Sequence, residues 1–127
     1  MYTHRAVTTT DFEIIASFPQ DTVELFHMFP NASYPLTSAQ LEEAAGIRFK
    51  PTVILHLNEI VAYAIFYRQD NDYWLGNVIV SPSFRGQGAA QYLIHTMEMI
   101  AKEDLNSTRL KVACHSSNAR GLFFYTK

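Results

Sequence analysis

The period of the hydrophobic pattern changes twice along the second half of the chain, and this change most constrains the fold. Residues 52–57, 60–67 and 73–80 are rich in β-branched and aromatic residues, and only short polar turns separate them. Over residues 88–103 the apolar positions recur at helical spacing instead. Three β-rich runs joined by tight turns predict an antiparallel meander, because a short turn reverses the direction of the chain.

A fourth β-rich run, residues 109–115, follows the long helical segment. The strand over 73–80, the helix over 88–103 and this run form a βαβ unit, whose two strands lie parallel because the helix carries the chain back across the sheet. We therefore predict an α+β fold in one domain covering residues 1–127. Its mixed central sheet, an antiparallel meander followed by the βαβ unit, is flanked by helices.

The remaining segments predict one more strand and four shorter helices. The expected elements are a strand over residues 4–7 and helices over 12–17, 21–29, 41–45 and 118–126. Thr37 and Gln40 have the spacing of a capping box before the third helix, and Gly46 is a suitable end for it. In the helix over 21–29 we expect Val23, Phe26 and Leu25 to form the apolar side.

Composition and charge argue against several classes of function. The net charge of −2 does not suggest a nucleic-acid-binding protein. No apolar run approaches the roughly 20 residues of a transmembrane helix, and the N-terminus lacks the apolar segment of a signal peptide. Cys114 is the only cysteine, and no two of the five histidines are spaced i, i+4, so no metal site is predicted. We expect a cytoplasmic protein with no membrane, nucleic-acid or metal partner.

The stretch that carries chemical information joins the strand over 73–80 to the following helix. Residues 80–90 read Val-Ser-Pro-Ser-Phe-Arg-Gly-Gln-Gly-Ala-Ala. Glycines there let the backbone turn its N–H groups inward, and the start of the helix adds positive potential, so the segment suits a phosphate. Arg85 adds a charged contact. A tight strand-to-helix turn without a ligand explains the two glycines about equally well.

Two nucleotide-binding patterns can be compared with this spacing. A P-loop needs Gly-x-x-x-x-Gly-Lys followed by Ser or Thr, and the chain has no such segment. A dinucleotide fingerprint needs Gly-x-Gly-x-x-Gly. Gly86 and Gly88 match it, but Gln91 stands where the third glycine belongs, and the second βαβ half of that fold is missing. A dinucleotide-binding fragment is therefore disfavoured.

The same stretch resembles the acetyl-CoA loop of the GNAT superfamily of N-acetyltransferases. That loop reads Arg/Gln-x-x-Gly-x-Gly/Ala, and Arg85, Gly88 and Ala90 meet every fixed position. The preceding Val80-x-Pro82 is also typical of the family. This motif stands between a predicted strand and a predicted helix, where the family has it.

A second motif of the family follows in the expected order. The family often shows Asn-x-x-Ala/Gly-x-x-x-Tyr after the second strand of the βαβ unit, and Asn118, Gly121 and Tyr125 fit it. The resemblance is specific over about residues 60–127. It implies a GNAT-like fold and the use of acetyl-CoA as cosubstrate, with no metal.

The resemblance assigns roles to particular residues. The CoA pyrophosphate would be held by the loop of Arg85, Gly86, Gln87, Gly88, Ala89 and Ala90. The pantetheine arm would bond to the backbone of Val78, Ile79 and Val80, and to Asn118. A backbone N–H near Val78 would stabilise the oxyanion. Tyr125 would protonate the leaving thiolate, since an ordinary tyrosine pKa is about 10 and that of a thiol about 8.5.

The base that deprotonates the attacking amine is not identified. Many members of the family use a glutamate on the third meander strand, whereas residues 73–80 contain no carboxylate and Asn77 is their only amide side chain. The candidates elsewhere are Glu24, His27, Asp70, Asp72 and His115. An ordinary surface role suits each of them, and none is assigned.

The resemblance implies an N-acetyltransferase in which a primary amine of a small molecule or peptide attacks acetyl-CoA directly. Residues 1–60 hold seven acidic and three basic residues, which favours a cationic amine such as a polyamine, an aminosugar, a lysine or a peptide N-terminus. The alternative is a non-catalytic module that binds or senses acyl-CoA. The missing base and the missing family ending favour that alternative.

The C-terminus departs from the family pattern. Members usually continue after the tyrosine with two more strands, which are missing from a chain that stops at Lys127. The strand over 109–115 would then be an uncovered edge, and such an edge invites association. Either the chain is truncated, or a partner covers the edge, or the ending is lost. We expect a homodimer formed through this end of the sheet.

Overall fold

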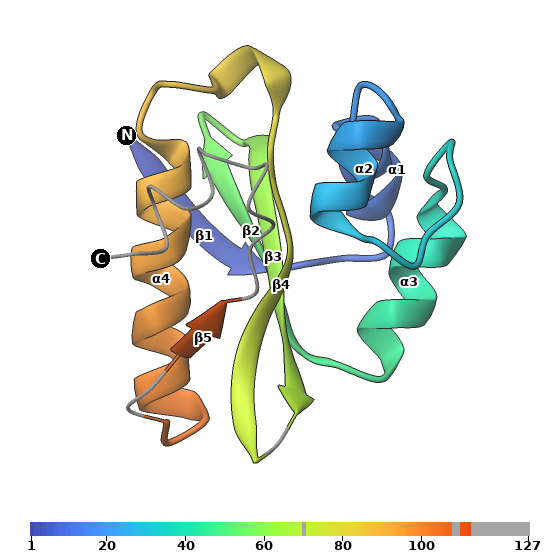
Figure 1. The fold of residues 1–127 in the computed structure, drawn as a ribbon. Helices are drawn as coiled ribbons and strands as arrows, with labels where there is room; N and C mark the ends of the chain where they lie inside the picture. The colour runs from blue at the N-terminus through green and yellow to red at the C-terminus, as the bar shows by residue number, and fades with distance from the viewer. Residues whose placement is uncertain (70, 108–109, 113–127) are drawn as a thin grey trace.

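A computed structural model describes residues 1–69, 71–107 and 110–112. The strands are β1 (Tyr2–Ala6), β2 (Phe49–His56), β3 (Glu59–Gln69), β4 (Asp72–Val80) and β5 (Leu110–Val112). The helices are α1 (Asp11–Ala16), α2 (Thr22–Met28), α3 (Ser38–Gly46) and α4 (Ala89–Asp104), and a 3₁₀ turn covers Pro82–Phe84. The strands form one sheet in the order β1-β2-β3-β4-β5, with α4 on one face and α1 to α3 on the other (Figure 1).

The predicted mixed sheet is confirmed. Strands β2, β3 and β4 form the antiparallel meander, and β5 pairs with β4 in parallel, with Tyr73 opposite Leu110 and Leu75 opposite Val112. The predicted N-terminal strand is present one to two residues earlier and extends the sheet antiparallel to β2. The rest of the strand predicted over 109–115 and the helix predicted over 118–126 lie outside the described residues.

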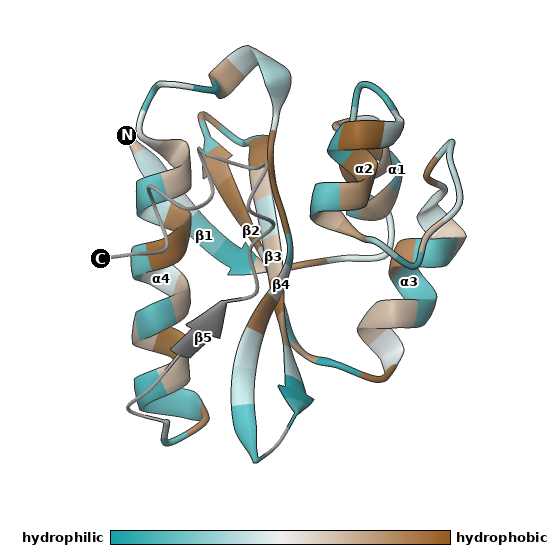
Figure 2. Cartoon of the chain, viewed as in Figure 1, coloured by the Kyte–Doolittle hydropathy of each residue, from teal (hydrophilic) through white to brown (hydrophobic). Residues whose placement is uncertain are grey.

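Two apolar cores lie on opposite faces of the sheet, because successive side chains of a strand point to opposite faces. Tyr63 of β3 packs with α1, α2 and α3 in the first core, whereas Phe66 of β3 packs beneath α4 in the second. Leu93 and Met97 of α4 are fully buried there. Figure 2 shows apolar residues alternating with polar ones along α4, and the buried ones pack on the sheet.

The apolar side predicted for the helix over 21–29 is wrong in part. Leu25 and Met28 are buried, whereas Val23 is 61% exposed and Phe26 is 43% exposed. Both pairs are spaced i, i+3, so the helix has two apolar faces, and periodicity alone does not choose between them. Packing in the folded chain turns the Leu25 and Met28 face inward, and the backbone carbonyl of Met28 also accepts a hydrogen bond from Asn77 of β4.

The helix cap predicted at Thr37 is found, and a second cap lies at Asp21. The Asp21 carboxylate accepts a hydrogen bond from the backbone N–H of Glu24 at 2.9 Å, and α2 begins at the next residue, Thr22. The Thr37 hydroxyl accepts one from the backbone N–H of Gln40 at 3.3 Å, and α3 ends at Gly46. These bonds satisfy N–H groups that the first turn of a helix leaves without partners.

A partly buried ion pair ties β1 to the start of α1. Asp11 is 6% exposed, and its carboxylate accepts hydrogen bonds from Arg5 at 2.7 Å and from the backbone N–H of Thr8 at 2.7 Å. The hydrogen bond from Arg5, helped by that from Thr8, holds the pKa of Asp11 below its ordinary value despite burial. The pair therefore stabilises the fold only while Asp11 is ionised.

We expect this pair to produce an acid-sensitive contribution to stability. A carboxyl group whose pKa is lowered on folding stabilises the protein above its unfolded pKa, and this is lost as the pH falls through the folded pKa. The free energy of unfolding in urea should thus fall more steeply below about pH 4 in the wild type than in Asp11→Asn. Glu13→Gln removes an exposed carboxylate from the same helix as a control. Equal slopes in wild type and Asp11→Asn would contradict the expectation.

Candidate functional site

The turn between β4 and α4 requires its two glycines for their backbone conformation. Gly86 has φ +78° and Gly88 has φ +87°, both in the left-handed region that L side chains rarely adopt. At neither position would an added Cβ meet another atom within 4 Å. Crowding therefore does not explain the glycines. The backbone path does, and open space remains beside it.

The start of α4 is open to an anion. Gly88 occupies the cap position and makes no side-chain capping bond, and the first turn carries no acidic residue. The first N–H groups of a helix have no acceptor within the helix, and the helix dipole adds positive potential at this end. Ala89 is 1% exposed, so its small side chain lies inside the core. This arrangement can hold a phosphate group through backbone N–H donors.

Contacts to other segments hold the turn in place. The Tyr2 hydroxyl of β1 donates to the backbone carbonyl of Gln87 at 2.8 Å, and the Gln87 side chain donates to the carbonyl of Ser83 at 2.9 Å. The Phe84 ring lies 5.5 Å from the ring of His56 on β2. A ligand at this turn would meet an ordered backbone, which lowers the entropy lost on binding.

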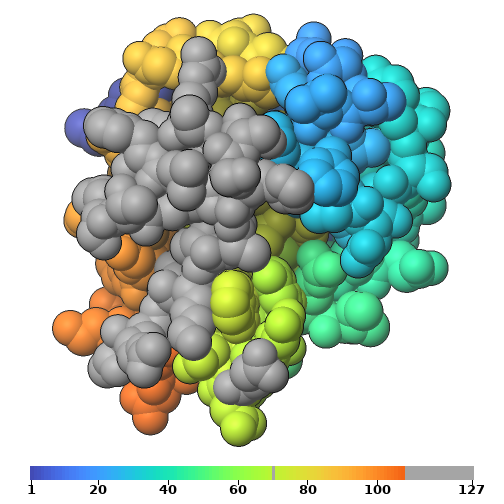
Figure 3. Space-filling view, in the orientation of Figure 1, coloured from blue at the N-terminus to red at the C-terminus, as the bar shows by residue number. Residues whose placement is uncertain are grey.

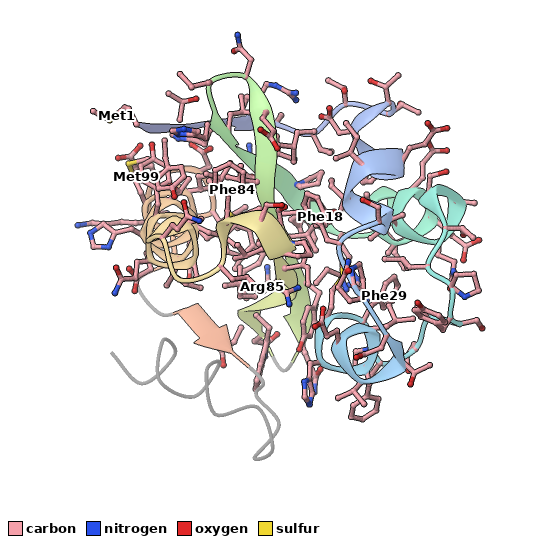
Figure 4. The ribbon with its side chains drawn as sticks, turned by 90° about the horizontal axis from the view of Figure 1, so that it is seen from above. Met1, Phe18, Phe29, Phe84, Arg85 and Met99 are labelled. Atoms are coloured by element: carbon pink, nitrogen blue, oxygen red, sulfur yellow. The ribbon has the colours of Figure 1, made fainter. Side chains whose placement is uncertain are left out.

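The Arg85 side chain is paired with a carboxylate of α2. Its two terminal nitrogens each donate to Glu24 at 2.9 Å, and its Nε donates to the carbonyl of Val80 at 3.2 Å. In Figure 4 Phe84 lies on the α4 side of the turn and Arg85 on the side of α2. Figure 3 shows the segment after β4, in yellow, next to the first helices, in blue. The sequence did not reveal this partner, which is 61 residues away.

A bulge interrupts β4 at Asn77 and Val78, where the segment predicted to bind pantetheine begins. Tyr63 of β3 pairs with Ile79 and Ile65 pairs with Gly76, so Asn77 and Val78 together lie opposite one residue of β3. Asn77 has φ +53°, in the left-handed region that asparagine tolerates better than most residues. A bulge leaves one residue out of the ladder of hydrogen bonds. Backbone groups near Val78 thus lie outside the ladder with β3.

The Asn77 side chain joins the bulge to two other segments. Asn77 is 4% exposed; its amide nitrogen donates to the carbonyl of Met28 at 3.1 Å, and its amide oxygen accepts from Arg48 at 2.7 Å. The Arg48 guanidinium carbon lies 5.4 Å from the centre of the Phe29 ring and 5.5 Å from that of Tyr67. Sequence analysis identified Asn77 as an isolated amide in a strand but missed Arg48.

The structure brings together most of the residues expected to bind the cofactor. Val78, Ile79 and Val80 lead directly into the turn that contains residues 85–90, and β5 pairs with β4 only at Tyr73 to Leu75 among the described residues. Asn118 and Tyr125 lie outside the described residues. Their predicted roles remain predictions.

The candidate bases are placed in different surroundings. Glu24 is engaged by Arg85 through both carboxylate oxygens. Asp72 begins β4, about 16 Å from Asn77 along an extended strand. His27 is half-buried on α2, while Asp70 and His115 lie outside the described residues. None of these candidates is assigned as the base.

Two further findings concern the described part of the chain. No helix there is both long and apolar enough to cross a membrane. Within the same residues, no three histidine, cysteine, aspartate or glutamate side chains come together as a metal site would require.

Comparison with known proteins gives a family match and several similar folds. The description "Acetyltransferase (GNAT) family" belongs to a family model that matches residues 14–127. The ribosomal-protein-S18-alanine N-acetyltransferase of Escherichia coli is 20% identical with a TM-score of 0.73, over 99% of this chain and 75% of that chain. A ribosomal-protein-alanine N-acetyltransferase of Brucella melitensis is 18% identical with a TM-score of 0.78, over 98% and 81%.

A third similar structure contains a bound cofactor. It is an N-acetyltransferase of Thermoplasma acidophilum in complex with coenzyme A, 12% identical with a TM-score of 0.74, over 99% of this chain and 87% of that chain. No curated protein sequence matches the chain significantly. At these identities the solved structures show a shared fold.

Proposed function

Because this chain belongs to the GNAT acetyltransferase family, we propose that it transfers an acetyl group from acetyl-CoA to a primary amine of a small molecule or peptide in the cytoplasm. The observation that carries the proposal is the turn after β4. Two left-handed glycines lead there into an uncapped helix start, and the family's acetyl-CoA motif occupies the same residues. The neighbour with bound coenzyme A supports the choice of cofactor.

The cofactor is proposed to lie along the end of β4. The N–H groups over residues 85–90 hold its pyrophosphate, and the start of α4 adds positive potential. The backbone of Val78, Ile79 and Val80, with Asn118, bonds the pantetheine amides. The bulge at Asn77 supports this placement, because it removes backbone groups of β4 from the ladder where the thioester would lie.

The proposed reaction is a direct attack of the amine on the thioester carbonyl. A carbon–nitrogen bond forms, the carbonyl oxygen becomes an oxyanion beside the N–H of Val78, and the carbon–sulfur bond then breaks. Tyr125 gives its proton to the departing thiolate and regains one from the solvent. The proton lost by the amine passes to water, since residues 73–80 contain no carboxylate and Glu24 is paired with Arg85.

A second candidate function, a non-catalytic acyl-CoA-binding module, is favoured by the lack of a carboxylate in residues 73–80. Release of free CoA thiol from acetyl-CoA, measured against a panel of amines, separates the two functions. We expect at least one amine to accelerate thiol release well above hydrolysis and to appear acetylated by mass spectrometry. Binding of acetyl-CoA without acceleration by any amine would favour the module. Failure to bind acetyl-CoA would contradict both.

A further inference from the structure

Arg48 differs from Arg5 and Arg85 in its electrostatic surroundings. Arg5 is paired with Asp11 and Arg85 with Glu24, whereas no carboxylate of the described residues lies within 4.0 Å of Arg48. A partly buried guanidinium that lacks a carboxylate partner is costly to desolvate, and such a group commonly serves to bind an anion.

Most of the hydrogen-bonding capacity of Arg48 is unused by the described residues. A guanidinium has five N–H donors, and the described part of the chain accepts from one Arg48 nitrogen, through Asn77. No buried side-chain nitrogen or oxygen lacks a partner there. The remaining Arg48 nitrogens are therefore not fully buried, and they are the donors left for a ligand.

The surroundings of Arg48 strengthen its attraction for an anion. The rings of Phe29 and Tyr67 lie beside it, and apolar walls raise the strength of a charge–charge contact by excluding water. Its field reaches nearby groups: burial raises the pKa of Tyr63 and of Tyr67, and the charge of Arg48 opposes both rises. Gly76 leaves room for the Tyr67 ring, since a Cβ at position 76 would lie 2.9 Å from that ring.

We propose that Arg48 binds a carboxylate of the acceptor, so that the preferred acceptor carries its amine and a carboxylate a few atoms apart, as an amino acid does. The proposal rests on the proposed function, which places the acetyl group beside Val78. Arg48 contacts the residue directly before Val78. An acceptor amine positioned for attack there brings a nearby carboxylate toward the Arg48 nitrogens that Asn77 does not engage, where two parallel N–H···O bonds can form.

This assignment differs from the cationic acceptor favoured by the charge of residues 1–60. The net charge of a segment is spread over its surface and screened by salt, whereas Arg48 acts at contact distance beside the bulge. The contact with Arg48, and not the net charge of residues 1–60, therefore decides which acceptor is preferred.

The test compares amino acids with their carboxamides, which keep the same amine and side chain but lack the carboxylate charge. In the wild type, kcat/KM should be roughly 10- to 100-fold higher for the acid than for the amide. In Arg48→Met this ratio should fall to about one. Arg48→Lys, which keeps the charge but not the planar fork, should give an intermediate ratio.

Arg68→Met is the matched control. Arg68 also contacts an aromatic ring and makes one hydrogen bond, both with Tyr73, but it is exposed next to the β3–β4 turn. It should retain the wild-type ratio. Equal use of acid and amide by the wild type, or an unchanged ratio in Arg48→Met, would overturn the proposal. If Arg48→Met does not fold, the comparison of acid and amide in the wild type can still overturn the proposal.

A binding measurement separates this proposal from the proposed function. Wild-type protein saturated with coenzyme A is titrated with an N-acetylated amino acid and with its carboxamide. Tighter binding of the acid, lost in Arg48→Lys or Arg48→Met, supports recognition by Arg48 even if no amine is acetylated. Equal binding of acid and amide, together with turnover of neutral amines, would contradict the Arg48 proposal and leave the proposed function intact.

Discussion

Gly88→Glu is expected to abolish coenzyme A binding while the protein remains folded. The new side chain starts from a position with open space around it, so it adds a carboxylate to the turn without displacing core atoms. That negative charge would lie where the pyrophosphate is proposed to bind, at the positive end of α4. The left-handed φ of +87° adds strain of about 1 kcal/mol, which a stable domain tolerates. Titration calorimetry with coenzyme A measures the loss.

Two controls separate the effect of charge from other effects of this change. Gly88→Gln has the same backbone strain and nearly the same size but no charge, and it should bind coenzyme A more weakly than wild type yet measurably. Gly46→Glu adds a carboxylate at the end of α3, where an added Cβ also meets nothing within 4 Å, and it should bind normally. Thermal unfolding checks that each variant folds. Wild-type affinity in a folded Gly88→Glu protein would remove the turn from the cofactor site.

Tyr125→Phe is expected to lower kcat by roughly 10²- to 10⁴-fold, the range that general acid catalysis contributes. The thiolate of CoA is a poor leaving group without a proton, and phenylalanine has the same ring but no proton to give. The affinity for acetyl-CoA should change little, because the hydroxyl is proposed to act on the sulfur late in the reaction. Steady-state kinetics and calorimetry together measure the two quantities.

Tyr34→Phe is the matched control for the loss of a tyrosine hydroxyl. Tyr34 is 48% exposed, and its hydroxyl makes a long bond of 3.4 Å to the carbonyl of Gln20. This variant should keep wild-type kcat. If Tyr125→Phe also turned over at the wild-type rate, Tyr125 would have no part in protonating the leaving group.

The turn that carries the proposed cofactor site was predictable from sequence because its determinants are local. Gly86 and Gly88 stand where the chain must adopt positive φ, and Pro82 marks the end of β4. The caps at Asp21 and Thr37 are local in the same sense, since each side chain bonds to a backbone N–H three residues later. Periodicity likewise predicted β2, β3, β4 and α4.

The acceptor side of the site depends on contacts that no short segment contains. Arg48 meets Asn77 across 29 residues, Asn77 meets Met28 across 49, and Glu24 meets Arg85 across 61. Each contact requires the register of β4, its bulge and the rotation of α2 to be set together. The prediction that Val23 and Phe26 face the core was wrong because the sequence gives α2 two apolar faces, and only packing selects one.

The sequence by itself therefore determined the order of elements, the mixed sheet and the backbone conformation of the turn before α4. These follow from steric limits on φ, from capping bonds and from hydrophobic period, all of which act within a few residues. The tertiary structure alone decided which charges meet: it neutralises Arg85 with Glu24 and leaves Arg48 without a carboxylate among the described residues. The physical reason is that electrostatic contacts depend on distances in space, which the folded sheet and helices set and sequence spacing does not.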